Sequence, residues 1–227
     1  MKNFIIALGG SIAVPNGIDM SFMKKFRSFL IEEMDKGSKF IIIIGGGSVC
    51  RDYNKVASQI TEVSNLNLDL MGIQSTRLNA EFLKAIFSDY TNPIILDKRM
   101  KVKEFGSYSL VIGCGWEPGH STDFDTVQTA VDFNIKTAII LGKPDYVYTS
   151  DPEKDKNAKP IKQLNWDEYF KLVPKEWIPG LSSPVDITAA KLAKEKDIKV
   201  IVSFGGDLDN FKNILEEKDF KGTLISN

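Results

Sequence analysis

The sequence predicts an α/β fold built on one doubly wound, mainly parallel sheet with helices on both faces. Short apolar runs alternate with longer segments of helical pattern, which is typical of parallel βαβ units. Glycines follow several of these runs, at the strand ends where sheets of this kind bind ligands. With 227 residues, the chain is long enough to bury a sizeable core.

The expected strands are short apolar runs bounded by turn residues. They cover residues 4–8, 40–44, 93–96, 109–112, 137–141 and 199–204, and a short closing edge is expected at 223–225. The expected helices show apolar residues at helical spacing, as Phe22, Phe26, Phe29 and Leu30 do in the first of them. They cover residues 21–36, 49–61, 72–87, 123–133, 166–172, 187–196 and 208–216. Residues 143–184 are rich in Pro, Lys and Asp and show little strand pattern, so we expect an inserted lobe there.

Composition narrows the class of protein. The formal charge of −1 argues against a general nucleic-acid binder and against a protein of basic membrane surfaces. Cys50 and Cys114 are isolated and lack metal-site spacing, as expected for a reduced, cytoplasmic protein. The first apolar run is too short for a signal peptide, and no run reaches the roughly 18 apolar residues of a membrane span.

Two glycine turns indicate a site for phosphate groups. Gly45-Gly46-Gly47 follows the run 40–44, and Gly9-Gly10-Ser11 follows the run 4–8. Glycine lets backbone amides approach an anion closely, and the start of a helix adds favourable potential. Arg51, about one helical turn after Gly47, can turn its guanidinium back toward the same anion. Either turn alone could equally be a ligand-free connection, but the presence of both favours phosphate binding.

Three further segments carry candidate residues. The loop 113–123 is richer in glycine than helix capping requires, so we favour a role in reading an acceptor with hydroxyls and amides. His120 is the only histidine and has no metal partners nearby, so we do not assign it as a catalytic base. Tyr148 could stack on a planar base and Asp151 could bind a hydroxyl, although an ordinary Asp-Pro turn explains this segment equally. Asp186 could organise charge around a transferring phosphate or simply cap its helix, and the sequence does not separate these roles.

Taken together, six segments resemble the amino acid kinase family and, within it, the archaeal type of uridylate kinase. They occur in the family's order: Ala-Leu-Gly-Gly-Ser at 7–11, Gly-Gly-Gly-Ser-Val-Cys-Arg at 45–51, Asp-Leu-Met-Gly-Ile-Gln-Ser-Thr-Arg-Leu-Asn-Ala at 69–80, Glu-Pro-Gly-His-Ser-Thr-Asp at 117–123, Tyr-Thr-Ser-Asp-Pro at 148–152 and Asp-Ile-Thr-Ala-Ala-Lys at 186–191. The segments at 69–80 and 117–123 are the most specific to this branch. Three places depart from the pattern: Ala7, where many relatives have lysine, the segment 142–148, and Trp116 with the helix start 123–126.

The resemblance implies a three-layer α/β/α sandwich, with residues 1–227 as one amino acid kinase-like domain that is usually assembled as a hexamer. The acceptor would bind to about 1–135 and the donor nucleotide to about 136–227. The implied reaction transfers the γ-phosphoryl group of ATP, with Mg²⁺ as cofactor, to UMP and gives UDP. A related kinase for another small phosphate or carboxylate acceptor, or an inactive nucleotide- or oxyanion-binding relative, remains an alternative.

The resemblance also implies roles for individual residues, with no protein ligand for a metal. The residues nearest the chemistry would be Gly10, Arg51 and Asp186. The UMP-binding residues would be Gly45, Asp69, Gly115, Trp116, Glu117, Pro118, Gly119, His120, Ser121 and Thr122. The ATP-binding residues would be Gly9, Gly10, Ser11, Gly46, Arg51, Gly142, Lys143, Tyr148 and Asp151.

Overall fold

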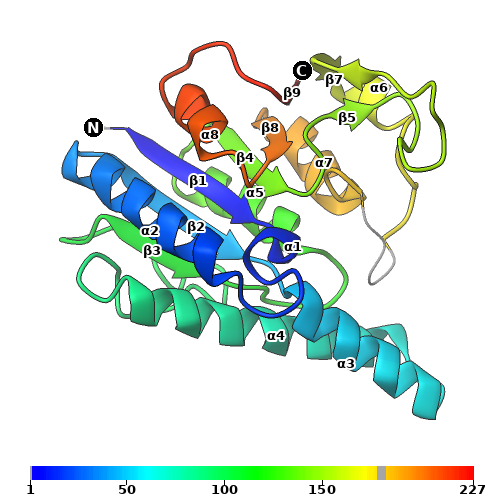
Figure 1. The fold of residues 1–227 in the computed structure, drawn as a ribbon, viewed down its shortest axis with the longest axis horizontal. Coiled ribbons are helices and arrows are strands. Elements are labelled where there is room, and N and C mark those ends of the chain that lie inside the picture. The colour runs from blue at the N-terminus through cyan, green and yellow to red at the C-terminus, as the bar shows by residue number, and fades with distance from the viewer. Residues whose placement is uncertain (1, 178–182) are drawn as a thin grey trace.

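A computed structural model describes residues 2–177 and 183–227 and confirms the α/β fold (Figure 1). Its main sheet has seven strands in the order β3-β2-β1-β4-β8-β9-β7. The strand pairs are parallel except that of β8 and β9, which is antiparallel. In sheet order the strands are β3 (Leu110–Gly113), β2 (Lys39–Ile44), β1 (Asn3–Leu8), β4 (Thr137–Gly142), β8 (Lys199–Phe204), β9 (Thr223–Ser226) and β7 (Gln163–Asn165).

Strands β1, β2, β3, β4 and β8 consist mainly of apolar residues because helices cover both faces of the sheet. Alternate residues of β1 point to opposite sides: Ile6 and Leu8 join one core cluster, and Ile5 and Ala7 join the other. The first cluster is closed by α2 (Met20–Asp35), α4 (Asn65–Ile86) and α8 (Leu208–Leu215). The second is closed by α5 (Thr122–Asp132), α6 (Trp166–Tyr169) and α7 (Ile187–Glu195).

Strand order reverses at β1, which places a ligand crevice at its carboxyl end. Both β2 and β3 lie on one side of β1, whereas β4 and β8 lie on the other. Such a switch point is where open α/β sheets bind ligands. Two helices start beside this crevice: the short α1 (Gly10–Ala13), which follows β1, and α3 (Gly47–Ile60), which follows β2.

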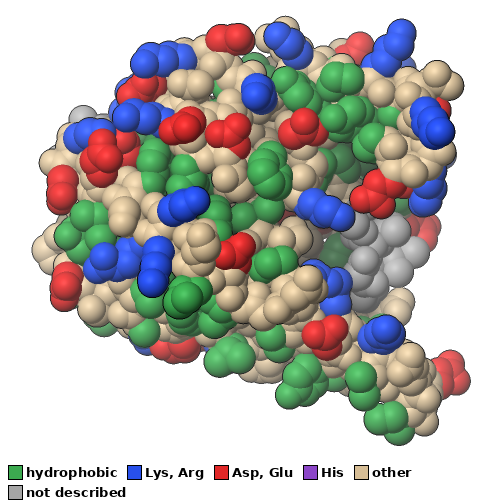
Figure 2. Space-filling view, viewed as in Figure 1, with side chains coloured by type: hydrophobic (Ala, Val, Ile, Leu, Met, Phe, Trp, Pro, Cys, Tyr) green, Lys and Arg blue, Asp and Glu red, His purple; other side chains and the backbone are tan. Residues whose placement is uncertain are grey.

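Helices α3 and α4 project together from the body of the molecule (Figure 1). Large apolar side chains are exposed on them, and apolar atoms are visible at this end of the surface in Figure 2. They are Tyr53, Val56, Ile60, Leu66, Leu70 and Leu78. No helix within the described ranges is long and apolar enough to cross a membrane.

One expected strand is wrong, another expected strand lies inside the sheet instead of at its edge, and one helix starts earlier than expected. Residues 93–96 make only one isolated bridge, at Leu96, because Pro93 lacks an amide and the Asn92 side chain accepts a hydrogen bond from the Ile94 amide. At the opposite end of the sheet from β3, the edge strand is β7, which pairs with β9. The expected closing edge at 223–225 therefore lies inside the sheet. Helix α4 begins at Asn65 instead of 72 because the Ser64 hydroxyl caps it.

The expected lobe at 143–184 is only partly separate from the sheet. It contains a small hairpin of β5 (Val147–Tyr148) and β6 (Pro160–Ile161), but β7 and α6 belong to the main body. Residues 178–182 of this segment lie outside the described residues.

Candidate functional site

The two glycine turns predicted from the sequence touch each other at the carboxyl ends of β1 and β2. A Cβ atom on Gly10 would lie 2.0 Å from the Gly47 nitrogen, and one on Gly45 would lie 2.7 Å from the Gly10 nitrogen. Gly47 also has a φ of 68°, a conformation that favours glycine. Only backbone fits between the turns, so their amide groups can face one shared space.

Arg51 lies beside both turns. The Ser48 amide donates to the Val14 carbonyl at 2.8 Å, which joins the start of α3 to the chain that leaves α1. The Arg51 Nη2 atom donates to the next carbonyl, that of Pro15, at 2.9 Å. This bond ties the exposed guanidinium to the chain that leaves α1, about one helical turn from the start of α3, whose first amides have no partner within the helix. This is an arrangement that attracts phosphate.

A third glycine turn, Gly205-Gly206 after β8, was missed in the sequence analysis. The Gly205 amide donates to the Gly142 carbonyl, and the Gly9 amide donates to the Leu141 carbonyl, both at 2.9 Å. A Cβ atom on Gly205 would lie 3.0 Å from Ile12 Cγ1. The ends of β1, β4 and β8 therefore meet beside Gly9 and Gly142. The signal was present, because Gly205 follows an apolar run as the other glycine turns do.

One face of α4 holds three separate parts of the site. The buried Asn79 Nδ2 donates to the Gly45 carbonyl at 2.8 Å and to the Gly46 carbonyl at 3.2 Å. Thr76 Oγ1 accepts a hydrogen bond from the Gly115 amide at 2.9 Å, and Asp69 Oδ2 accepts one from the Gly119 amide at 2.8 Å. The sequence analysis selected only Asp69 of this group. The spacing of three and seven residues, which places them on one face of a helix, could have found the other two.

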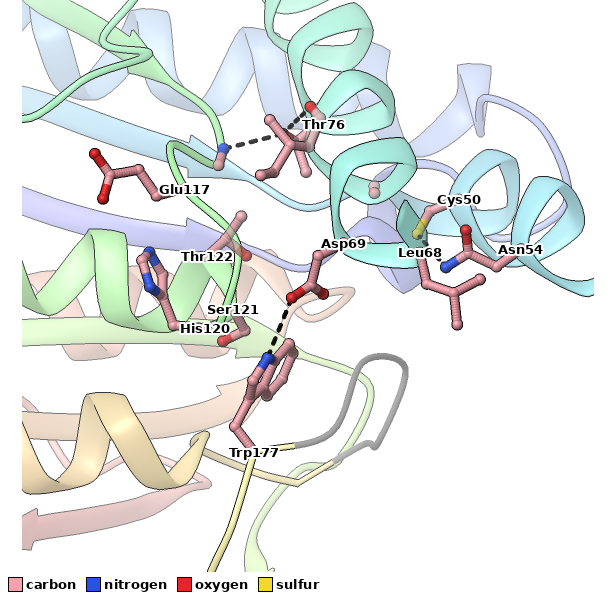
Figure 3. A pocket seen from close by; sticks show the side chains of 14 residues that line it. Cys50, Asn54, Leu68, Asp69, Thr76, Glu117, His120, Ser121, Thr122 and Trp177 are labelled. Atoms are coloured by element: carbon pink, nitrogen blue, oxygen red, sulfur yellow. Dashed lines mark hydrogen bonds between the residues drawn. The ribbon is translucent and has the colours of Figure 1, made fainter. Parts of the chain in front are cut away.

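A pocket extends from the second glycine turn to the loop 115–122 (Figure 3). Trp177, which was not expected here, closes one side, with its Nε1 atom 3.5 Å from Asp69 Oδ2. The described lining residues are Gly46, Cys50, Asn54, Leu68, Asp69, Gly72, Ile73, Thr76, Gly115, Glu117, His120, Ser121, Thr122 and Trp177. Six of the predicted acceptor residues are therefore together.

The other predicted acceptor residues are near the pocket without lining it. Gly45 lies behind Gly46, and Pro118 and Gly119 lie on the outer side of the loop, where they are exposed. The Trp116 ring packs against the second core cluster, and its Nε1 atom donates to the Leu96 carbonyl at 3.1 Å. Its side chain serves the fold rather than the pocket.

Asp186 is a buried helix cap that also ties α7 to the acceptor loop. Its Oδ1 atom accepts hydrogen bonds from the Thr188 amide and hydroxyl and from the Ala189 amide. Its Oδ2 atom accepts from the Ser121 amide at 3.0 Å and from the Ser121 hydroxyl at 2.6 Å. Five hydrogen-bond donors contact the carboxylate, and these contacts agree with the role of a helix cap. A direct catalytic role remains a prediction.

Asp186, the cap of α7, lies close to two acidic residues at the start of α5, Asp123 and Asp125. Burial, together with the charge of Asp186, raises the pKa of Asp123 to about 7. Burial also raises the pKa of Asp125 to about 6, although its hydrogen bond with His120 opposes the rise. Burial lowers the pKa of His120, but the neighbouring carboxylates of Asp125, Asp186 and Glu117 leave it raised overall. These three groups on this side of the pocket therefore keep their protons to a higher pH than they would in water.

The residues predicted to bind ATP lie less close together than those predicted to bind UMP. Gly9, Gly10, Ser11, Gly46 and Gly142 lie around the glycine turns. Lys143 is exposed with its Nζ atom 3.4 Å from Glu153, and the Tyr148 hydroxyl donates to Asp145 Oδ1 at 2.8 Å. Asp151 is exposed and accepts a hydrogen bond from the Glu153 amide at 3.0 Å, as in an ordinary Asp-Pro turn. Their roles toward a nucleotide remain predictions.

This combination defines an α/β phosphate-binding protein whose anion site opens into a pocket of nucleoside-binding chemistry. The chain belongs to the amino acid kinase family, whose family model matches residues 2–203. It is 33% identical to the uridylate kinase of Thermoplasma volcanium over 99% of this chain and 97% of that protein. It is 29% identical to the uridylate kinase of Methanocorpusculum labreanum over 100% of this chain and 97% of that protein. The crystal structure of uridylate kinase from Archaeoglobus fulgidus superimposes with a TM-score of 0.84 at 27% identity and covers the full length of both chains.

Proposed function

We propose that the protein is a UMP kinase, which transfers the γ-phosphoryl group of ATP to UMP and gives UDP. The observation that carries the proposal is the continuous pocket from the glycine turn at Gly46 to the loop 115–122. One end offers the amides of the glycine turn to a phosphate, with Arg51 about one helical turn along α3 and outside the pocket lining, and the other end offers Asp69 and the loop hydroxyls to a nucleoside. Relatives named uridylate kinase match the chain over nearly its whole length, which supports the same assignment.

The residues support alignment and charge neutralisation, which are the main requirements of phosphoryl transfer. An oxygen of the UMP phosphate, already an anion at neutral pH, attacks the γ-phosphorus, and the bond to the β-phosphate oxygen breaks to leave ADP. A general base is therefore not required. Gly9, Gly10 and Ser11 would hold the donor phosphates, and Arg51 would offset negative charge between donor and acceptor.

Mg²⁺ fits this site as a cation carried by the nucleotide. The described residues contain no group of three or more carboxylate, thiol or imidazole side chains able to hold a metal. Mg²⁺ in kinases is bound largely by substrate phosphates and water, and the glycine turns leave space for phosphates. When bound, the ion would neutralise phosphate charge.

We further propose that acceptor recognition resides mainly in residues 1–135 and donor recognition in 136–227, with the protein working in the cytoplasm. Trp177 is an exception to this division, because it reaches the acceptor pocket from the second part.

The exposed apolar side chains of α3 and α4 support a homo-oligomer, with a hexamer as the expected form. Tyr53, Val56 and Ile60 repeat at helical spacing and are 65%, 53% and 78% exposed. A grouping of this kind marks an interaction surface, and we propose a second copy of the chain as its occupant. Light scattering should show an oligomer that Val56→Asp with Ile60→Asp reduces in size, whereas a monomeric wild type would refute this part of the proposal.

The test of the activity is a coupled assay of ADP release with ATP, Mg²⁺ and a panel of acceptors. UMP should react, and CMP and carboxylate acceptors should react far more slowly. Reaction with another acceptor while UMP stays inert would keep the family and overturn the substrate. Binding of ATP without turnover on any acceptor would refute a kinase.

A further inference from the structure

Asp125 is a fully buried carboxylate directly behind the acceptor pocket. Its Oδ1 atom lies 3.0 Å from His120 Nε2. Its Oδ2 atom has no hydrogen-bond partner among the described residues and would lie 3.9 Å from a Cβ atom on Gly115, which lines the pocket. A buried carboxylate is costly unless its hydrogen bonds offset the loss of water, so a carboxylate with His120 as its side-chain partner and one unpartnered oxygen requires an explanation.

His120 connects this carboxylate to the pocket. The ring lines the pocket, and its side chain is only 14% exposed (Figure 3). It packs against Phe124 with the ring centres 4.3 Å apart, so Phe124 and Asp125 fix the ring from two directions. Both supporting residues lie in the first turn of α5.

We propose that Asp125 is a positioning residue for acceptor recognition: it holds the Nε2 atom of His120 and leaves Nδ1 as the ring nitrogen available to the acceptor. This inference rests on the proposed function, because the acceptor is taken to be a nucleoside monophosphate. A carboxylate accepts a hydrogen bond from Nε2–H, which fixes the proton on that nitrogen. Nδ1 can then contact polar atoms of the base or sugar, and in the protonated ring it donates to their oxygens.

The surrounding charges favour the protonated ring. Asp125 faces it from α5, Asp186 from the start of α7 and Glu117 from the loop, and all three are acidic. On α4, the cation Arg77 is paired with Asp97 at 3.0 Å, and Asp69 accepts a hydrogen bond from the Gly119 amide. Asp125 is the only one of these carboxylates in the described structure that contacts the ring by a hydrogen bond. Its loss should therefore change both the charge and the orientation of His120.

Nuclear magnetic resonance can test the pair directly, because the chain contains one histidine. In the wild-type protein, the ¹⁵N spectrum should show the proton on Nε2 whenever the ring is neutral. UMP should shift the Nδ1 signal more than the Nε2 signal. Asp125→Asn, which keeps an oxygen but removes the charge, should lower the pKa of His120 by about one unit or more.

Kinetics provide the second readout. Asp125→Asn should raise KM for UMP about 5- to 10-fold, leave KM for ATP within about twofold, and shift the pH dependence of KM for UMP toward lower pH, as expected for a lost charge–charge contact. Asp132→Asn is the matched control, because Asp132 pairs with Arg99 at the far end of α5 at 2.8 Å. It should leave both KM values unchanged.

Three results would overturn the proposal: a neutral wild-type ring protonated on Nδ1, an unchanged pKa of His120 in Asp125→Asn, or equal changes in KM for UMP and ATP. The first needs no variant, so it applies even if Asp125→Asn does not fold. The ring measurements on the ligand-free protein are also independent of activity. A wild type that does not phosphorylate UMP would refute the proposed function and leave the Asp125–His120 assignment to be decided by the spectra.

Discussion

Replacement of Asn79 by leucine should damage the acceptor end of the site more than the donor end. The side chain is 4% exposed, and one amide group serves the carbonyls of both Gly45 and Gly46. Leucine has similar bulk but leaves both carbonyls without this donor. A buried polar group left unpaired costs about 1–3 kcal/mol, so we expect the free energy of unfolding to fall by about 2–3 kcal/mol.

The effect on activity follows from geometry. Without Asn79, the turn that presents the amides of Gly46 and Gly47 is no longer anchored to α4. Misplacement of a binding group by about 1 Å can cost about 100-fold, so kcat/KM for UMP should fall about 10- to 100-fold. KM for ATP should change about threefold or less, because the donor turn at Gly9 makes no contact with Asn79 among the hydrogen bonds of the described residues.

The measurements are urea unfolding and steady-state kinetics with each substrate varied in turn. Asn67→Leu is the matched control, since Asn67 is exposed in the first turn of the same helix. It should change neither stability nor kinetics appreciably. An Asn79→Leu protein that keeps wild-type stability and KM for UMP would refute the anchoring role.

Three further perturbations test other parts of the site. Arg51→Ala should lower kcat/KM about 10- to 100-fold in kinetic assays, because a charged hydrogen bond contributes about 1.5–3 kcal/mol. The free energy of unfolding should change little, because Arg51 is exposed. Unchanged kinetics would exclude its phosphate role. Asp69→Asn should raise KM for UMP about tenfold and KM for ATP much less, and equal changes would argue against ribose recognition. Asp123 has its pKa raised from 3.8 to about 7, so the folded protein holds this proton where the unfolded chain has lost it, and stability falls as pH rises from about 4 to 7. In urea unfolding, Asp123→Asn should remove up to about 4 kcal/mol of that decline, and an unaltered pH profile would show that Asp123 does not cause it.

Local patterns were sufficient to predict most elements. Apolar runs followed by glycine predicted β1, β2 and β4, because strands buried on both faces leave a continuous apolar signal. The two glycine turns were predicted as one composite site, and the structure brings them into backbone contact. The error at 93–96 shows the limit of this reasoning. That run is apolar enough for a strand, but Pro93 and the Asn92 side chain determine the local conformation.

Contacts between distant segments could not be predicted in the same way. Trp177 reaches Asp69 from 108 residues away, and Asn210 of α8 bonds to Ser203 and the Lys221 backbone in a region with no sequence motif. The close pairing of Asp125 with His120 was also missed, although only five residues separate them. Its significance depends on the burial of both groups, and burial is a property of the folded chain.

In the proposed binding mode, the charges of the site would orient the acceptor. The end proposed for the phosphate contains the start of α3, with Arg51 about one helical turn along that helix, while the end proposed for the nucleoside contains Asp69 and Glu117 with Asp186 behind them. A nucleoside monophosphate bound in reverse would place its dianionic phosphate among these carboxylates and its hydroxyl groups among amides that prefer an anion. Each end therefore repels the wrong part of the ligand as well as attracting the right one. This asymmetry does not need a lysine at position 7, where Ala7 packs into the core beneath the turn, and in the proposed binding mode it would keep the acceptor phosphate facing the turn at Gly9 and Gly10.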